Sequence, residues 1–280
     1  MSEPELFEAP GASALIYRDA PAWGELKTAA IGGFSCRDAA SGGSLIESAK
    51  ARLRSEGFAA VVGPMDGDTW HRYRVVWESD GSAPFPMEPT SGPFDKQAFL
   101  SAGLAPISEY VSSRAALAEA IAGEPVVVPG VEISAWDGKD GERLVRRMFK
   151  MSLAAFASNR FYKPIGLDAF LKLYEPVMPL IDPRFVLFAH DSDGKLVGFL
   201  FGYPNRLEGK TPTTVVLKTY ASALRGVGHA LADRFHRAGL DLGFETVIHA
   251  LMHVDNASRQ RSSLHRATVF RRYALMGATL

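Results

Sequence analysis

The sequence predicts an α/β (α+β) fold, in which helices flank a mixed central sheet built from two unequal copies of one unit. Apolar residues make up 47% of the 280 residues, which is enough to fill the cores of two ordinary domains. Short β-branched runs alternate with segments of helical periodicity. The chain also matches itself at a fixed offset, which is the signature of an internal repeat.

The clearest self-match joins residues 57–62 (GFAAVV) with residues 243–248 (GFETVI), 186 positions apart. Two further pairs of segments keep this offset: the strand-like 29–36 and 215–222, and the helical 44–56 and 230–242. Each unit therefore runs in the order strand, glycine-containing turn, amphipathic helix, Gly-Phe, strand.

Further along the chain, residues 107–111 (ISEYV) resemble residues 270–274 (FRRYA) at an offset of 163. Since the offset falls from 186 to 163, the first unit carries about 23 extra residues. We place them in the Pro- and Gly-rich stretch 66–93.

The second unit has a longer beginning than the first. It is predicted to contain a strand at 131–136, helices near 139–158 and 166–180, and a hairpin at 185–204 whose turn is residues 191–194, whereas the first unit has only 13–20 there. Pro125 and Pro129 bracket three valines between the units. We therefore expect an abbreviated domain over residues 1–128 and a complete one over residues 129–280.

Charge and cysteine content exclude several classes of function. Lys plus Arg and Asp plus Glu number 31 each, so no net field attracts nucleic acid or an anionic membrane. The single cysteine, Cys36, excludes an internal disulfide and a cysteine-rich zinc site. The acidic amino terminus lacks the apolar core of a secretory signal, and no run approaches the roughly 20 apolar residues of a membrane span. We expect a cytoplasmic protein.

The glycine turn before the second helix has the features of a phosphate-binding loop. A Walker A loop is excluded, because Pro204 replaces the first glycine before the only Gly-Lys-Thr. A dinucleotide fingerprint is weak, since Gly226-x-Gly228 is followed by leucine where a third glycine is needed. The pattern Gln/Arg-x-x-Gly-x-Gly/Ala is matched by Arg225, Gly228 and Ala230.

Glycines allow such a turn to bring backbone N–H groups close to an anion, and the positive end of the following helix adds to the attraction. A pyrophosphate would fit there, with Arg225 supplying charge. The alternative is a glycine-rich helix entry without a ligand.

The order of elements around this turn resembles the GNAT acyltransferase superfamily over most of residues 131–280. The resemblance implies that acetyl-CoA or another acyl-CoA is the co-substrate and that its arm lies between strands 213–222 and 245–253. It assigns coenzyme binding to Thr219, Tyr220, Arg225, Gly226, Val227, Gly228, His229, Ala230 and Asn256. For Asn256 the alternative is a simple N-cap.

The first unit also resembles a GNAT fold, so the chain resembles a tandem GNAT protein with one degenerate half. Position 225 corresponds to Ala39, Gly228 to Gly42 and Ala230 to Ser44. The turn is kept but its arginine is lost, and we expect no coenzyme there.

Acyl transfer to an amine needs a base for the ammonium proton, a stabilised oxyanion and an acid for the leaving thiolate. In the GNAT resemblance the acid is a tyrosine on the helix after the fifth strand, but counting from Asn256 places Ser263 there. Tyr220 is another candidate donor. His253 is the candidate base, because an imidazole titrates in a suitable range. A structural or exposed histidine is the alternative.

His249 and His253 are expected to share one face of the fifth strand by alternation. Four positions apart on a strand, they are too far separated to share a metal ion, so we expect no metal site. The arginines of the carboxyl-terminal region are expected to form a solvated face or to bind the 3′-phosphate or an acidic acceptor: Arg259, Arg261, Arg266, Arg271 and Arg272.

The sequence thus predicts an acyltransferase that moves an acyl group, expected to be acetyl, from acyl-CoA to an amine by direct attack. The alternative is an inactive acyl-CoA binding or sensing module. A nucleotide-binding oxidoreductase is disfavoured by the missing third glycine. The acceptor would be a small-molecule or peptide amine, with no nucleic acid or membrane partner. A homodimer is one assembly that the sequence permits.

Overall fold

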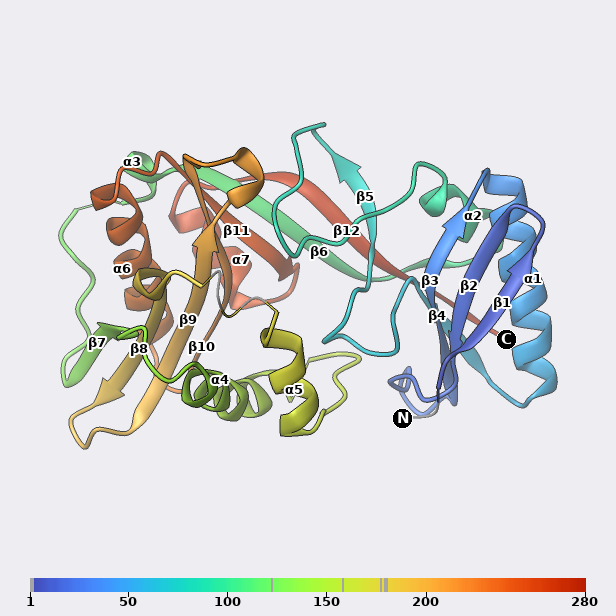
Figure 1. Cartoon of the computed structure of the whole chain (residues 1–280), viewed down its shortest axis with the longest axis horizontal. Coiled ribbons are helices and arrows are strands. Elements are labelled where there is room, and N and C mark those ends of the chain that lie inside the picture. The colour runs from blue at the N-terminus through green and yellow to red at the C-terminus, as the bar shows by residue number, and fades with distance from the viewer. Residues whose placement is uncertain (1–2, 122, 158, 177, 179–180) are drawn as a thin grey trace.

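A computed structural model describes residues 3–121, 123–157, 159–176, 178 and 181–280. It contains one mixed sheet of twelve strands with helices on its faces, which confirms the predicted fold class (Figure 1). The strand order is β1-β2-β3-β4-β12-β6-β11-β10-β9-β8-β7, and β5 pairs with β12. The strands of the first half are β1 (Glu5–Ala9), β2 (Ala12–Tyr17), β3 (Thr28–Cys36), β4 (Ala60–Gly63), β5 (Val75–Ser79) and β6 (Ala105–Ala116).

The second half contributes the remaining strands: β7 (Val131–Ala135), β8 (Val186–Asp191), β9 (Leu196–Pro204), β10 (Thr214–Ser222), β11 (Thr246–His253) and β12 (Thr268–Thr279). The α-helices are α1 (Ala39–Ser55), α2 (Asp95–Ser101), α3 (Leu117–Ala120), α4 (Gly141–Phe156), α5 (Leu167–Tyr174), α6 (Val227–Asp241) and α7 (Ala257–Leu264). Short 3₁₀ turns occupy Pro183–Phe185 and Arg206–Glu208.

The predicted repeat is present in the geometry of the sheet. In the first half β3 and β4 pair in parallel from Thr28 opposite Ala60, and in the second half β10 and β11 pair in parallel from Thr214 opposite Thr246. Thr28 and Thr214 are 186 positions apart, and so are Ala60 and Thr246, which is the offset found in the sequence. The helices α1 and α6 connect these pairs, so each half has the same strand, helix, strand unit.

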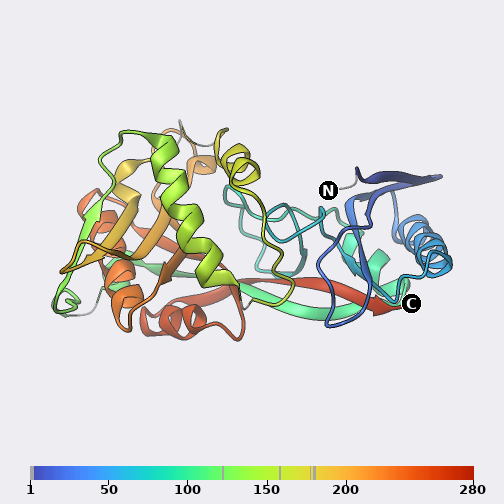
Figure 2. The ribbon, with the colours of Figure 1, turned by 90° about the horizontal axis from the view of Figure 1, so that it is seen from below.

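The strands β6 and β12, which the offset of 163 relates, are exchanged between the halves. β6 comes from the first half but pairs with β11, whereas β12 comes from the second half but pairs with β4. The two also pair with each other and run across the middle of the molecule, joining its two lobes (Figure 2). Each half of the chain thus completes the sheet of the other, and the division at residue 128 stays a prediction.

Three details differ from the sequence expectations. β1 was not expected; it forms a hairpin with β2 through Gly11, whose φ of +83° suits glycine. α1 begins five residues earlier than predicted, because the Asp38 carboxylate accepts the Ser41 N–H at 2.8 Å and caps the helix there. α5 ends at Tyr174 instead of continuing to 180, since Pro176 follows. Residues 177, 179 and 180 lie outside the described residues.

The core of the second half lies on both faces of the sheet. Val215 packs with Phe235 of α6 on one face, while Val216 packs with Met148 of α4 on the other. This alternation is what a strand buried on both faces requires. In the part of the chain that the structure describes, no helix combines the length and apolar character needed to cross a membrane.

Candidate active site between β10 and β11

The parallel strands β10 and β11 diverge halfway along their length. Their pairing ends at Leu217 opposite His249. At this point β10 has a bulge at Lys218 relative to β9. β11 has a bulge relative to β6 just after His249, where Leu251 has a φ of +56°. Because a bulge adds a residue and bends its strand, the two bulges turn the strands away from each other.

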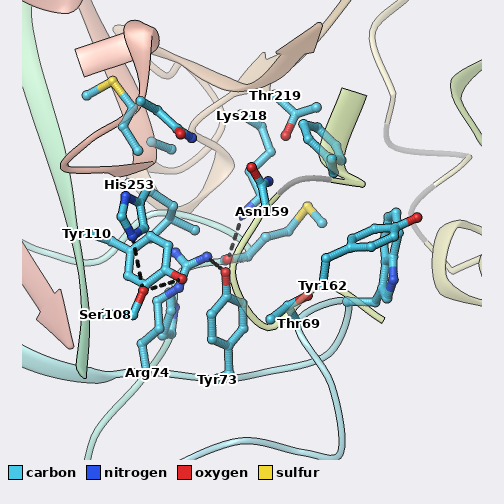
Figure 3. A pocket seen from close by; sticks show the side chains of 18 of the residues that line it. Thr69, Tyr73, Arg74, Ser108, Tyr110, Asn159, Tyr162, Lys218, Thr219 and His253 are labelled. Carbon is cyan, nitrogen blue, oxygen red and sulfur yellow. Dashed lines mark hydrogen bonds between the residues drawn. The ribbon is translucent and has the colours of Figure 1, made fainter. Parts of the chain in front are cut away.

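A cavity of about 1540 Å³ opens between the diverging strands and extends toward the first half. Both halves line this shared cavity, as Figure 3 shows at close range. β10 and β11 contribute Lys218, Thr219, Tyr220 and His253, while the first half contributes Tyr73, Arg74, Glu88, Ser108 and Tyr110. The segment 66–93, identified as the extra residues of the first unit, is therefore one wall of the cavity. Among the described residues no cluster of three or more His, Cys, Asp or Glu could hold a metal ion.

The glycine turn lies where β10 leads into α6. Gly226 has a φ of +87° and precedes the first helical residue, Val227. The side chains of Val227 and Ala230 are buried in the core, whereas Arg225 and Gly226 are exposed. His229 is half-buried, and its ring meets His265 edge to face. The surface that this turn offers a ligand therefore consists of backbone, and the first N–H groups of α6 point out of the helix end.

Arg261 of α7 approaches the same turn from the side. Its Nη1 donates to the Tyr220 hydroxyl at 3.3 Å and would lie 2.9 Å from a Cβ added at Gly228. In the sequence, Arg261 stands out only as a member of a basic run. In the structure two arginines, Arg225 and Arg261, flank the turn.

Asn256 and Ser263, the two predicted site residues at α7, differ in their access to the cavity. Asn256 occupies the N-cap position, but its side chain makes no capping hydrogen bond, and it lines the shared cavity. Ser263 is exposed, and its hydroxyl donates to the carbonyl of Arg259 on its own helix. The neighbouring Ser262 is the buried one. The predicted proton-donor position thus falls on the solvent side of α7.

The expectation that His249 and His253 share a face was wrong. Since β11 has one residue more than β6 between them, the alternation shifts and the two rings point to opposite faces. His249 is buried against α6, with its Nε2 at 2.9 Å from Nε2 of His236. His253 meets the ring of Tyr110 edge to face. Both histidines line the shared cavity, since it opens between the diverging strands.

His253 belongs to a hydrogen-bonded chain that crosses from β11 to β6. Its Nδ1 accepts the backbone N–H of Asp255 at 3.2 Å, which leaves the proton on Nε2, 3.1 Å from the Ser108 hydroxyl. Ser108 in turn donates to the Tyr110 hydroxyl at 3.0 Å. Burial lowers the pKa of His253, so the neutral ring is favoured.

Lys218 was missed by the sequence analysis. It lies in the β10 bulge, lines the shared cavity, and donates weakly to the carbonyl of Met87 at 3.4 Å. Burial, assisted by the positive charge of Arg74, lowers its pKa to about 7, while Glu88 acts in the opposite direction. The signal in the sequence was a single lysine inside the apolar run VVLKTYA.

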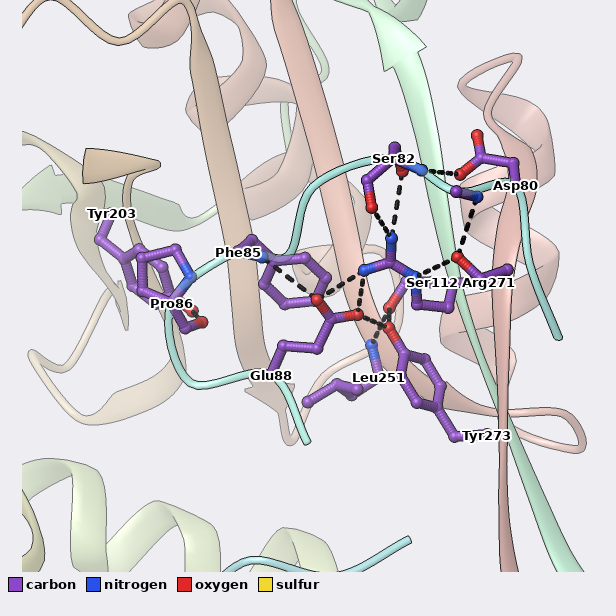
Figure 4. Close-up of polar contacts among 12 residues, drawn as sticks. Asp80, Ser82, Phe85, Pro86, Glu88, Ser112, Tyr203, Leu251, Arg271 and Tyr273 are labelled. Atoms are coloured by element: carbon purple, nitrogen blue, oxygen red, sulfur yellow. Dashed lines mark hydrogen bonds and ion pairs between the residues drawn. The ribbon is translucent and has the colours of Figure 1, made fainter. Parts of the chain in front are cut away.

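The segment 66–93 is held to the sheet by a buried ion pair. Arg271 Nη1 donates to both carboxylate oxygens of Glu88, at 2.6 and 2.8 Å, and the Tyr273 hydroxyl donates to the same carboxylate (Figure 4). Tyr273 also contacts Ser112 at 3.0 Å, and Ser112 accepts the Leu251 N–H. This network connects the cavity wall to the β11 bulge. Arg271 is buried, so its assignment to a solvated or ligand-binding basic face was wrong.

Comparison with known proteins supports the fold. No family model and no curated protein matches the sequence. A GCN5-related N-acetyltransferase from Sphaerobacter thermophilus is 15% identical, with a TM-score of 0.59 over 99% of this chain and 80% of its own. A tandem GNAT protein from the clavulanic acid biosynthesis pathway is 15% identical, with a TM-score of 0.56 over 96% of this chain and 79% of its own. These structures confirm the predicted resemblance at the level of the fold, and the chain has a GNAT-like fold over nearly its whole length.

Proposed function

We propose that the protein is an acyl-CoA-dependent N-acyltransferase whose coenzyme site lies in the second half. The observation that carries the proposal is the divergence of β10 and β11, with a glycine turn near one end and the shared cavity between the strands. The linear pantetheine arm of an acyl-CoA, which ends in the thioester, would fit in the gap between β10 and β11. The fold alone does not fix the activity, which depends on the residues of this site.

The coenzyme would be held mainly by backbone. The pyrophosphate would accept N–H groups of the turn at Gly226–Gly228, with Arg225 and Arg261 supplying positive charge on either side. The pantetheine arm would follow the free edge of β10 at Thr219 and Tyr220, and Asn256 would contact the arm. An N–H group on this edge would stabilise the carbonyl oxygen as it becomes negative.

In the proposed reaction the neutral amine attacks the thioester carbonyl, forming a C–N bond and breaking the C–S bond. Lys218 takes the ammonium proton, because its lowered pKa of about 7 leaves a large neutral fraction near neutral pH. His253 is the weaker candidate, since its Nδ1 lone pair already accepts the Asp255 N–H. Tyr220 would protonate the thiolate: Arg261 donates to its oxygen, which leaves the phenolic hydrogen for the leaving group.

A second candidate function is an acyl-CoA binding or sensing module without turnover. It is favoured by the position of Ser263, which faces solvent where the resemblance calls for a tyrosine. The two functions share the coenzyme site and differ only in chemistry.

Isothermal titration of the purified protein with acetyl-CoA tests the coenzyme site, with NADH as the control ligand and Arg225→Ala as the matched variant. We expect micromolar binding of acetyl-CoA, weakened in the variant, and none of NADH. Thiol release on a panel of amines then separates the two functions. Binding without release from any amine would favour the sensing module, and no binding at all would refute both.

A further inference from the structure

Arg74 is a buried cation in the wall of the shared cavity. It is 7% exposed, and the ring centroids of Tyr73 and Tyr110 lie 3.8 and 3.7 Å from its guanidinium carbon. Its φ of +86° is rare for a residue with a side chain. The backbone is fixed there by a hydrogen bond from the Arg74 N–H to the carbonyl of Pro64, at 2.9 Å. The fold therefore holds this guanidinium at a defined place.

The charge of Arg74 has no counterion in the described structure. Its Nη2 donates to the Tyr73 hydroxyl, but Nε and Nη1 have no hydrogen-bond partner, and no carboxylate lies within ion-pair distance. The nearby Glu88 is neutralised by Arg271. Since burying a guanidinium without a counterion is unfavourable, an unpaired one beside a cavity points to an anionic ligand. Burial accordingly lowers the pKa of Arg74 to about 10.

The other carboxylates that line the shared cavity do not supply that anion, and two of them, Glu3 and Glu109, are exposed. Asp66 accepts the Gly33 N–H at 2.7 Å and faces Arg72 at 3.4 Å. Asp255 is exposed beyond His253. Lys218 adds a second basic group near Arg74 (Figure 3). Arg74 and Lys218 thus give this wall of the shared cavity two basic groups.

We propose that the acceptor is an amine that also carries a carboxylate, and that Arg74 binds this carboxylate while the amine points to the β10–β11 gap. The inference rests on the proposed function and names its acceptor class. The rings of Tyr73 and Tyr110 crowd the guanidinium, and its Nε and Nη1 atoms are themselves buried, so a small planar carboxylate fits beside it better than a bulkier anion. The phenolic hydroxyls of both tyrosines provide further polar contacts.

The test compares the twenty L-amino acids with their α-carboxamides as acceptors, with acetyl-CoA as donor and thiol release as readout. In the wild type we expect at least one acid to be used with a kcat/KM on the order of 10- to 100-fold above its own amide, the value of one charge-assisted hydrogen bond. Arg74→Gln should abolish this preference, because only the acid loses a partner, whereas any change in the pKa of Lys218 affects acid and amide alike and cancels in their ratio. Arg74→Lys should retain part of it.

Two controls separate the explanations. Arg160 also lines the cavity, but its Nη1 donates to the carbonyl of Ile107 at 2.6 Å, so Arg160→Gln should leave the acid-to-amide ratio unchanged. Acetyl-CoA affinity should be the same in Arg74→Gln and wild type, which also shows that the variant folds. Undiminished coenzyme binding with no acid preferred over its amide would overturn the role of Arg74 alone. Failure of the wild type to bind acetyl-CoA would overturn the proposed function and this inference together.

Discussion

The two halves of the molecule contain equivalent parallel strand pairs, β3–β4 and β10–β11, but they differ in what lies beside these strands. In the second half the strands diverge around a cavity. In the first half the position equivalent to Lys218 is Gly32, where an added Cβ would collide with Met65 and Asp66. Asp66 also accepts the N–H of Gly33, the equivalent of Thr219. A carboxylate of the chain itself thus occupies the place where we propose that a thioester carbonyl binds in the second half.

The glycine turns differ in the same way. A Cβ at Gly42 would lie 2.7 Å from the Cβ of Ala98 on α2, whereas a Cβ at Gly228 would lie 2.9 Å from Nη1 of Arg261. The first turn is thus covered by a helix of the protein, and the second by the end of a long, flexible side chain. The Asp38 carboxylate also satisfies the end of α1, whereas Gly226 leaves the end of α6 without a side chain. A repeated backbone therefore does not by itself make a repeated site. A ligand site forms only where the protein's own side chains leave the strand edge and the helix N-terminus free. In the first half Asp66 occupies the strand edge and Asp38 caps α1.

The largest expected effect concerns Lys218, because the first half has no counterpart to it. We expect Lys218→Met to lower kcat by about 100-fold or more, the usual contribution of a general base. Its pKa is lowered to about 7, so the neutral, active form predominates above that pH. The wild-type rate should rise as pH increases through about 7, and this limb should be missing in the variant. A variant with the wild-type profile would exclude Lys218 as the base.

The next effect compares the two turns directly. Valine at Gly228 would meet Arg261 and Tyr220 and cover the turn, so Gly228→Val should weaken acetyl-CoA binding roughly 10- to 100-fold. The matched Gly42→Val should cost about 1–3 kcal/mol of unfolding free energy by overpacking against Ala98, with coenzyme affinity unchanged. Titration calorimetry and urea denaturation measure the two quantities. Equal losses of affinity in both variants would mean that both turns bind the coenzyme.

A smaller effect is expected at the exposed arginine beside each turn. Arg225→Ala should weaken acetyl-CoA binding by about tenfold, because one charge-assisted contact to the pyrophosphate is lost. Raising the salt concentration should reduce the difference from wild type, since the contact is exposed. Arg37, next to the first turn, pairs with Asp38 and should be neutral when replaced by alanine. Weakened binding in Arg37→Ala would argue against a coenzyme site confined to the second half.

The smallest effect is expected at Ser263. Its hydroxyl faces solvent on α7, so Ser263→Ala should leave kcat within about twofold of wild type. Ser263→Tyr should not accelerate the reaction for the same reason. A marked gain of rate in the tyrosine variant would show that α7 rotates or shifts when the coenzyme is bound.

The sequence predicted the repeated part of the fold well, because strand and helix periodicities recur at one offset. It could not show that β6 pairs with β11 and β12 with β4, since an offset of 163 indicates that the two strands are equivalent but does not determine which strand each pairs with. It also placed His249 and His253 on one face, because alternation cannot reveal a bulge such as that at Leu251.

The sequence pointed to several residues that line the cavity, Thr219, Tyr220, His253 and Asn256, but not to Lys218 or to the side chains from the first half. The turn at residues 225–230 is a local pattern and could be recognised from the sequence. Arg74 and Glu88 could not, because they lie in a Pro- and Gly-rich segment that reaches the second half through long-range contacts, among them the ion pair of Glu88 with Arg271. Lys218 carried a weak signal, a charge inside an apolar strand, whose meaning depends on a cavity that only the folded chain creates.

The most direct test of the difference between the two halves is a crystal structure of the protein with acetyl-CoA. Our account predicts one coenzyme per chain, with its pyrophosphate on the Gly226–Gly228 turn and its arm between β10 and β11. It also predicts that the Asp66 carboxylate still accepts the Gly33 N–H in the first half. A coenzyme between β3 and β4, or one bound outside the β10–β11 gap, would contradict it.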